Sequence, residues 1–382
     1  MTLRGNGVLH PAILAGGFAI FGGATASPRG MSHLGAWGSH QYFFDYATLG
    51  FVRRGFVATL LAPLPDAFVL AAAPWLMLVA TFGLFAVFVR WTMRAFHPGP
   101  DSLRTAWLWS AVLCPLTFMN LGFDNGRYDV LGLLLTCAAL TTANRGKPWL
   151  AGSAVALSCL IHEASLVLFA PLVIVTSWSI ASRTNPSART SILVRLCTPI
   201  VLVVIALLAW GSYEPGHPAL MEHFKKLEAL QDVSSDNRFR ATRVLTDGPF
   251  DHVQIYLRDL ISSRRLWQNL LAGIVTSLIV GSVIRDTRSV LRLPLLWVGA
   301  LAPLLLIPIA SDIFRWMSLA TLNVYLGFTF ICANRPELLD RIPEADDFPS
   351  LAPMGLFAVL GPMGVTSFAP VWQEIIQLVT RP

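Results

Sequence analysis

Charged side chains interrupt this otherwise apolar sequence at a few short sites, and their types suit chemistry on phosphate and hydroxyl groups. Arginine has a permanent, planar charge that binds phosphate through paired donors. A carboxylate or a neutral histidine can accept the proton of a hydroxyl group. The arginines are Arg53, Arg54, Arg127 and Arg315; the candidate acid–base residues are Asp45, Asp129, His162 and Glu163; Asp124 and Asp312 are supporting residues. Ionisable residues at the edges of apolar spans are costly, so they indicate a pathway or an active site.

The composition indicates an integral membrane protein. The 382 residues are 54% hydrophobic and only 13% charged, whereas a soluble domain has about 25% charged residues. No polar stretch is long enough to form a second core, so we expect one polytopic domain over 1–382. The net charge of +6 fits the basic residues of cytoplasmic loops and does not require nucleic acid as a partner.

Apolar runs of about 20 residues each predict about eleven transmembrane helices. They lie near 10–26, 66–90, 104–121, 128–144, 148–164, 165–181, 191–211, 267–284, 293–310, 313–332 and 351–371. Every second connector is basic, which predicts an N-terminus inside, a C-terminus outside and all the polar sites on the outer face. The first run could instead be a cleaved signal peptide, because Ala24-Thr25-Ala26 resembles a cleavage site.

Two longer connectors are predicted to lie outside the membrane. The first outer loop, 27–64, mixes aromatic residues with charge, so we expect it along the membrane surface. The second, 212–266, contains two stretches with apolar residues at helical spacing, His217–Leu230 and Asp251–Leu271. Such stretches are typical of amphipathic helices in the interfacial plane.

The run from Asp124 to Asp129 is expected to open a transmembrane helix on the outer side. A helix N-terminus binds anions through its free N–H groups, and Arg127 would add a phosphate-binding charge. Asp124 or Asp129 could act as a base or could orient Arg127. The structural alternative is helix capping with a local ion pair.

The pair His162-Glu163 divides two apolar runs. His162 could shuttle a proton and Glu163 could act as a general base. The alternative is a polar kink in which each side chain forms hydrogen bonds with a neighbouring helix.

Asp312 and Arg315 have the i, i+3 spacing of a helical ion pair. Arg315 would then be either a second phosphate contact or an arginine that reaches toward the headgroups.

The first outer loop offers Asp45 as a base or metal ligand and the Arg53-Arg54 pair between two glycines. No His-Glu-x-x-His spacing is present in the sequence, so no metal is predicted, although a divalent metal is compatible with the chemistry. Several arginines and carboxylates outside the membrane suggest an anionic substrate with a leaving phosphate and a nucleophile that must be deprotonated, and lipid-phosphate-linked sugars fit this description. Displacement at the anomeric carbon of such a sugar would require no redox cofactor.

Part of the sequence resembles the EpsG family of bacterial exopolysaccharide proteins, which is related to Wzy-type polymerases. The similar features are Arg127 at the start of a helix, the basic turn Arg145-Gly146-Lys147, and His162 followed by Glu-Ala-Ser165. A second feature is Asp312-Ile-Phe-Arg315 heading a helix with Tyr325. The resemblance covers about 124–180 and 312–331, and it departs from the family where Tyr-Asp follows Arg127 and Glu163 follows the histidine.

The first outer loop is more similar to that of GT-C glycosyltransferases, in which an acidic residue of this loop takes part in catalysis. Both resemblances imply a polyprenyl-linked sugar donor, a glycan acceptor and an active site outside the cytoplasm. We therefore expect a glycosyltransferase or polysaccharide polymerase of the bacterial cytoplasmic membrane, in contact with membrane lipids. The alternatives are a transporter or flippase for lipid-linked sugars, and a non-catalytic membrane assembly protein.

Overall fold

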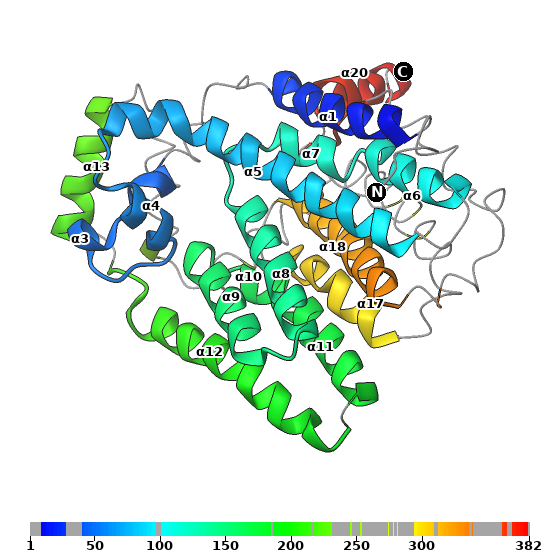
Figure 1. The fold of residues 1–382 in the computed structure, drawn as a ribbon. Helices are drawn as coiled ribbons and strands as arrows, with labels where there is room; N and C mark the ends of the chain where they lie inside the picture. Colours follow the sequence, from blue (N-terminus) through cyan, green and yellow to red (C-terminus); the bar gives the residue numbers. More distant parts are fainter. Residues whose placement is uncertain are drawn as a thin grey trace. The chain divides into compact units, whose positions relative to one another are not determined.

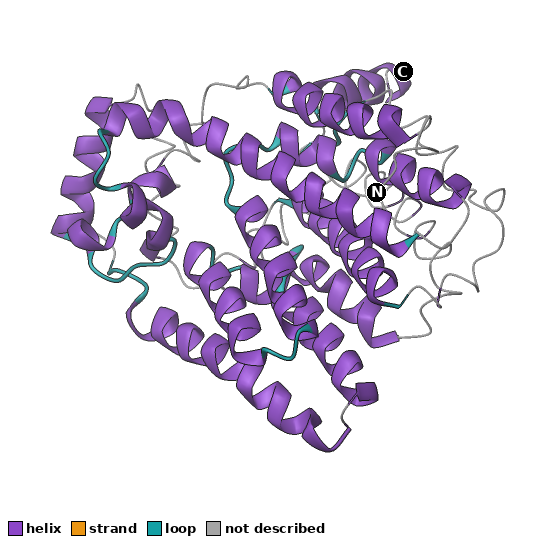
Figure 2. Cartoon of the chain, viewed as in Figure 1, coloured by secondary structure: helices purple, strands orange, loops and turns teal. Residues whose placement is uncertain are grey.

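The computed structural model describes residues 9–27, 40–96, 101–184, 186–214, 217–230, 245–246, 253, 274, 278, 281, 294–308, 312–335, 338, 361–364 and 369–380. Every regular element in these ranges is a helix (Figure 2), so the predicted all-helical fold class is confirmed. The chain divides into two compact units, and the division falls inside one long helix. One unit comprises Met1–Ser27, Thr81–Asp124 and His252–Pro382; the other comprises Pro28–Ala80 and Asn125–Asp251.

The first unit is built around a helix that is buried on all sides. Its elements are α1 (Leu9–Ala26), the second half of α5 (Asp66–Ala95), α6 (Asp101–Leu113), α7 (Phe118–Phe123), α17 (Pro294–Leu301), η3 (Ala302–Leu306), α18 (Ile313–Asn334) and α20 (Pro370–Thr380) (Figure 1). All residues from 313 to 333 of α18 are buried. The indole N–H of Trp107 donates to the Thr329 hydroxyl at 2.9 Å, and the rings of Phe88 and Trp107 both pack on Tyr325. These contacts make α18 the core of this unit.

Two glycines allow α1 and α7 to cross with their backbones in contact. A Cβ atom on Gly23 would lie 2.1 Å from the Met119 carbonyl oxygen, and one on Gly122 would lie 2.2 Å from the Ile20 carbonyl oxygen. Such approach is possible only without a side chain, as in the small-residue contacts of membrane helices. The predicted helix near 10–26 is therefore present, and it is packed into the first unit.

The predicted span near 104–121 is divided between α6 and α7. The interruption falls at Cys114–Thr117, where Pro115 supplies no N–H and its ring disfavours a continuous helix. The Thr117 hydroxyl lies within hydrogen-bonding distance of the carbonyls of Ala111 and Cys114. Since the Cys114 carbonyl already accepts the Thr117 N–H at 3.2 Å, the hydroxyl can serve the Ala111 carbonyl, which the interruption leaves open. This hydrogen bonding keeps the irregular segment compatible with an apolar environment.

The second unit consists of short helices followed by a group of longer ones. Its elements are η1 (Gln41–Phe43), α3 (Tyr46–Leu49), α4 (Gly55–Leu61), the first half of α5, α8 (Asp129–Asn144), α9 (Pro148–Ile161), α10 (Ser165–Leu168), α11 (Ala170–Thr184), η2 (Pro186–Ala188), α12 (Arg189–Trp210) and α13 (Pro218–Leu230). Helix α9 packs against both α8 and α12 (Figure 1). A Cβ on Gly152 would lie 2.1 Å from the Leu196 carbonyl oxygen, so α9 and α12 are also in backbone contact.

Four helices in the described ranges are long and apolar enough to cross a membrane. They are Asp66–Ala95, Arg189–Trp210, Ile313–Asn334 and the segment Arg104–Phe123, which counts as one span although it is divided between α6 and α7. Shorter apolar helices occupy Pro11–Ala26, Asp129–Asn144, Pro148–Ile161, Ser165–Ala181 and Leu296–Leu306. The predicted count of about eleven spans is not confirmed, because five of the predicted runs form these shorter helices. The predicted runs near 267–284 and 351–371 lie mostly outside the described residues.

Of the two amphipathic helices predicted in the loop 212–266, the structure describes one. The helix predicted over His217–Leu230 is confirmed as α13 (Pro218–Leu230). The stretch Asp251–Leu271 lies outside the described residues, apart from Val253. The sequence analysis missed α20 (Pro370–Thr380), although Trp372, Ile376 and Val379 recur there at helical spacing.

Candidate functional site

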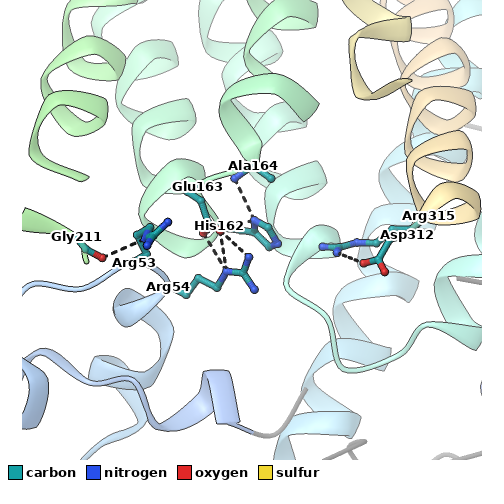
Figure 3. Close-up of polar contacts among 8 residues, drawn as sticks. All are labelled: Arg53, Arg54, His162, Glu163, Ala164, Gly211, Asp312 and Arg315. Atoms are coloured by element: carbon teal, nitrogen blue, oxygen red, sulfur yellow. Dashed lines mark hydrogen bonds and ion pairs between the residues drawn. The ribbon is translucent and has the colours of Figure 1, made fainter. Parts of the chain in front are cut away.

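The centre of the candidate site is an ion pair between Arg54 and Glu163, both in the second unit. Arg54 Nε donates to Glu163 Oε2 at 2.9 Å and Nη2 donates to Oε1 at 2.6 Å. Figure 3 shows the guanidinium facing the carboxylate in this paired arrangement. Paired, charge-assisted hydrogen bonds are the strongest that protein side chains form. Two of the predicted polar sites, the first outer loop and the pair His162-Glu163, are thus in contact.

Arg54 has an unusual backbone conformation. Its φ of 63° and ψ of 9° lie in the left-handed helical region, and it is the one non-glycine residue with positive φ in the described ranges. This conformation costs an L-residue about 1–2 kcal/mol. It places Arg54 at the N-cap of α4, within a turn in which the Gly55 N–H donates to the Val52 carbonyl. Backbone strain of this kind is concentrated at functional sites.

Glu163 lies in a short break between two helices. Helix α9 ends at Ile161 and α10 begins at Ser165, so the sequence correctly placed a polar interruption here. His162 is extended, with φ of −154° and ψ of 114°, and its N–H donates to the Ser158 carbonyl at 2.9 Å. The side chain of Glu163 is 28% exposed, against 10% for Arg54. The carboxylate is therefore the more accessible partner.

The hydrogen bonds of His162 indicate a neutral ring. Its Nδ1 accepts the Ala164 N–H at 3.1 Å, which an imidazolium nitrogen cannot do. The ring proton of the neutral form must then be on Nε2. Glu163 Oε2 lies 3.8 Å from the same Nδ1, and we treat this as proximity rather than as an ion pair. His162 is buried, and its bond to the Ala164 N–H stabilises the break between α9 and α10.

Opposing effects act on the pKa of Glu163. Burial raises the pKa of this carboxyl, but attraction to the Arg54 guanidinium and the hydrogen bonds from it hold the pKa well below its usual range. Glu163 is therefore ionised at neutral pH while it is paired with Arg54. In that state it is a weak base.

A set of buried hydrogen bonds fixes the first outer loop against the turn before α8. The Tyr42 hydroxyl and the Gln41 amide both donate to the Gly126 carbonyl, at 2.8 Å and 2.9 Å. In return, the Tyr128 hydroxyl donates to the Gln41 carbonyl at 2.9 Å. The two tyrosine rings meet edge to face at 5.0 Å. Gly126 has φ of 98°, which a side chain would disfavour. The loop that carries Arg54 is thus tied to the segment that carries Arg127.

A second attachment joins the loop to the end of α12. The backbone N–H and the Nε of Arg53 both donate to the Gly211 carbonyl, at 3.0 Å and 3.2 Å. Two residues later, the Tyr213 hydroxyl donates to the Leu49 carbonyl. Arg53, which the sequence offered as a phosphate ligand, here holds the loop in place (Figure 3).

The other two predicted site carboxylates of the second unit, Asp45 and Asp129, lie at the starts of helices. Both oxygens of Asp45 accept hydrogen bonds from Thr48, one from its N–H and one from its hydroxyl, so Asp45 caps α3. Asp129 is the first residue of α8 and is buried. The run Asp124–Asp129 was predicted to open a helix near 128–144, and α8 does begin at Asp129 with Tyr128 as its N-cap. Arg127 is half-buried beside that cap.

The first unit contains the other candidate pair. Arg315 Nη1 donates to Asp312 Oδ2 at 2.9 Å, which confirms the predicted i, i+3 contact. The guanidinium also lies over the Trp316 ring, 4.6 Å from its centre. Arg315 is buried, and Asp312 is the N-cap of α18. Asp124, in the same unit, is the C-cap of α7.

Sequence reasoning missed Gln41, Tyr42, Tyr128 and Gly211 as supports of the site. The tyrosines were visible as aromatic residues beside charge, but a hydrogen bond to a distant carbonyl has no signature in the sequence.

Among the described residues, no three His, Cys, Asp or Glu side chains are grouped so that they could hold a metal ion. The buried hydroxyls of Ser158 and Ser165 lie on either side of the break, and neither has a hydrogen-bond partner among the residues that the structure describes.

Comparisons of the chain with protein-family models, curated proteins and solved structures find no match. The function must therefore be argued from the site itself.

Proposed function

We propose that this protein is a membrane glycosyltransferase or polysaccharide polymerase of the bacterial cytoplasmic membrane. It transfers a sugar or oligosaccharide from a polyprenyl phosphate or pyrophosphate to a glycan acceptor. The N-terminus is inside, about eleven segments cross the membrane, and the active site faces outside, where a cell-surface glycan is built. The arrangement of basic connectors supports this orientation.

One observation carries the proposal: Arg54 and Glu163, which are 109 residues apart, meet in the second unit with His162 beside them. A buried guanidinium can bind and stabilise the charge that develops on a leaving phosphate. A carboxylate within the same cluster can accept the proton of the attacking hydroxyl group. Arg54 belongs to the predicted first outer loop, and Glu163 lies at the predicted outer end of the run near 148–164, where a lipid-linked donor presents its headgroup.

The other candidates have narrower roles in this proposal. Arg127 is a further phosphate ligand, because its neighbours Gly126 and Tyr128 are bonded to the loop that carries Arg54. Asp129 orients this segment from the first turn of α8. Asp45 and Arg53 hold the first outer loop in shape through their contacts with Thr48 and Gly211. Arg315, with Asp312, stays the candidate phosphate ligand of the first unit.

The test is binding of a polyprenyl-pyrophosphate-linked sugar to the purified full chain. Wild type should bind, and Arg54→Ala and Arg127→Ala should each lose at least about tenfold in affinity, which corresponds to about 1.4 kcal/mol. Arg145→Ala is the matched control, because it removes an exposed arginine of the same unit that is predicted to be cytoplasmic. If wild type fails to bind, or if all three variants lose affinity equally, the proposal is wrong. Binding with no transfer to any acceptor would favour a transporter or flippase.

A further inference from the structure

The carboxylate of Glu163 occupies the part of Arg54 that binds phosphate. Arginine presents Nε and one Nη as a pair of parallel donors, and carboxylate and phosphate oxygens fit this pair equally well. In the structure, Glu163 Oε2 and Oε1 accept from Nε and Nη2 at 2.9 Å and 2.6 Å. The two oxygens therefore lie where two oxygens of a bound phosphate would lie.

The two partners differ in how firmly they are held. Arg54 is fixed by its left-handed backbone, by its position at the start of α4 and by the adjacent attachment of Arg53 to Gly211. Glu163 lies in a turn outside the helices and is more exposed than Arg54, 28% against 10%. An incoming anion would thus find a fixed guanidinium covered by a side chain that can rotate away.

Building on the proposed function, we propose that the donor phosphate replaces the Glu163 carboxylate on Arg54, and that the displaced Glu163 is the catalytic base. The exchange conserves charge at the guanidinium, because one anion leaves as another arrives. It also orders the reaction, since the base becomes available only when the donor is bound. The paired arrangement is then the resting state of the site.

The chemical step balances with these groups alone. The acceptor oxygen forms a bond to the anomeric carbon as the bond from that carbon to the phosphate oxygen breaks. The electron pair of the broken bond stays on the phosphate, which Arg54 holds. The hydroxyl proton moves to the Glu163 carboxylate. When the polyprenyl phosphate or pyrophosphate leaves, Glu163 gives the proton to water and pairs with Arg54 again.

The electrostatics of Glu163 agree with this sequence of events. Burial raises the pKa of the carboxyl, and attraction to Arg54, together with the hydrogen bonds from its guanidinium, reverses the effect. Removing the guanidinium from the carboxylate leaves the burial effect less opposed, so the pKa rises toward the range in which a carboxylate is an effective base. His162 stays in place meanwhile, because its Nδ1 is bonded to the Ala164 N–H.

The experiment measures the affinity of purified full-length protein for polyprenyl pyrophosphate, without a sugar. Glu163→Gln removes the competing charge but keeps the side-chain shape, so this variant should bind about tenfold more tightly than wild type. Arg54→Ala should bind at least about tenfold more weakly. Glu222→Gln is the matched control, because it removes an exposed carboxylate of α13 in the same unit, and its affinity should equal that of wild type.

The outcomes separate the two proposals. If Glu163→Gln binds no more tightly than wild type while Arg54→Ala binds weakly, the exchange is overturned and the proposed function stands. If wild type and every variant fail to bind, the proposed function falls as well. Glu163→Asp guards against misfolding of the glutamine variant: its shorter side chain pairs less well with Arg54, so its affinity should lie between those of wild type and Glu163→Gln. Weaker binding by both variants overturns the exchange.

Discussion

The guanidinium of Arg54 and the carboxylate of Glu163 meet in a pair of hydrogen bonds although 109 residues separate them in the chain. The arginine reaches this position from a left-handed backbone conformation at the start of α4. The glutamate reaches it from a break between α9 and α10. An unfavourable backbone conformation on one side and an interrupted helix on the other are therefore linked by a single contact.

Substitutions of Arg54 can separate the free energy cost of its left-handed backbone conformation from the contribution of its charge. Arg54→Ala and Arg54→Gly both leave the partly buried Glu163 carboxylate without its partner, so both lose the same ion pair. Glycine adopts positive φ without strain, so Arg54→Gly should be about 1 kcal/mol more stable than Arg54→Ala. Thermal unfolding of the detergent-purified variants gives the comparison. Equal stabilities would mean that position 54 is not left-handed in solution.

The tyrosine contacts that attach the first outer loop to the turn before α8 can be removed without changing ring packing. Tyr42→Phe and Tyr128→Phe each delete one buried hydrogen bond to a carbonyl, with an expected loss of about 1 kcal/mol. Each variant should also bind the lipid-linked donor more weakly, because Arg54 loses part of its support. Affinity that stays at the wild-type level in the double variant would contradict a positioning role.

Much of the helical framework could be predicted from apolar runs alone. The run near 313–332 became Ile313–Asn334 and the run near 191–211 became Arg189–Trp210, because long uninterrupted apolar segments have few alternatives. The polar interruption at His162-Glu163 was equally clear, since charge within an apolar run disfavours a continuous helix.

The pairing within the site could not be predicted. The sequence offered several arginines and carboxylates on one predicted face, but no periodicity relates residues in different loops. That Arg54 meets Glu163, while Asp45 caps α3 through Thr48, depends on how the loop is folded and attached. The left-handed conformation at Arg54 was also invisible, because arginine is not a residue that favours it.

The stability of the second unit should fall in mild acid because of His40. Burial and the nearby His223 lower the pKa of His40 from 6.5 to about 4. As the pH falls from about 6.5 toward 4, the unfolded chain takes up a proton that the folded chain does not, so the free energy of unfolding decreases. The total loss approaches about 3 kcal/mol. In His40→Gln, a plot of unfolding free energy against pH should be flatter over this range; parallel curves would refute the assignment.

The crossing of α1 and α7 should be sensitive to a single methyl group. Gly122→Ala places a Cβ 2.2 Å from the Ile20 carbonyl oxygen, so the helices must separate, at a cost of about 1–3 kcal/mol. Gly83→Ala is the control within the same unit, because a Cβ there meets nothing within 4 Å. Unfolding temperatures should fall for the first variant and stay level or rise for the second. A fall in both would show that helix packing is not the cause.

The burial of α18 on every side has a consequence for how the chain is assembled during synthesis. Ribosomes make Phe88 and Trp107 long before Tyr325, the α18 residue on which those two rings pack. The earlier helices must therefore wait, incompletely packed, until the segment from Ile313 to Asn334 emerges and inserts among them. The centre of this unit is therefore made after the helices α5 and α6 that pack on it, so a nascent chain that stops before Ile313 lacks the central packing partner of Phe88 and Trp107.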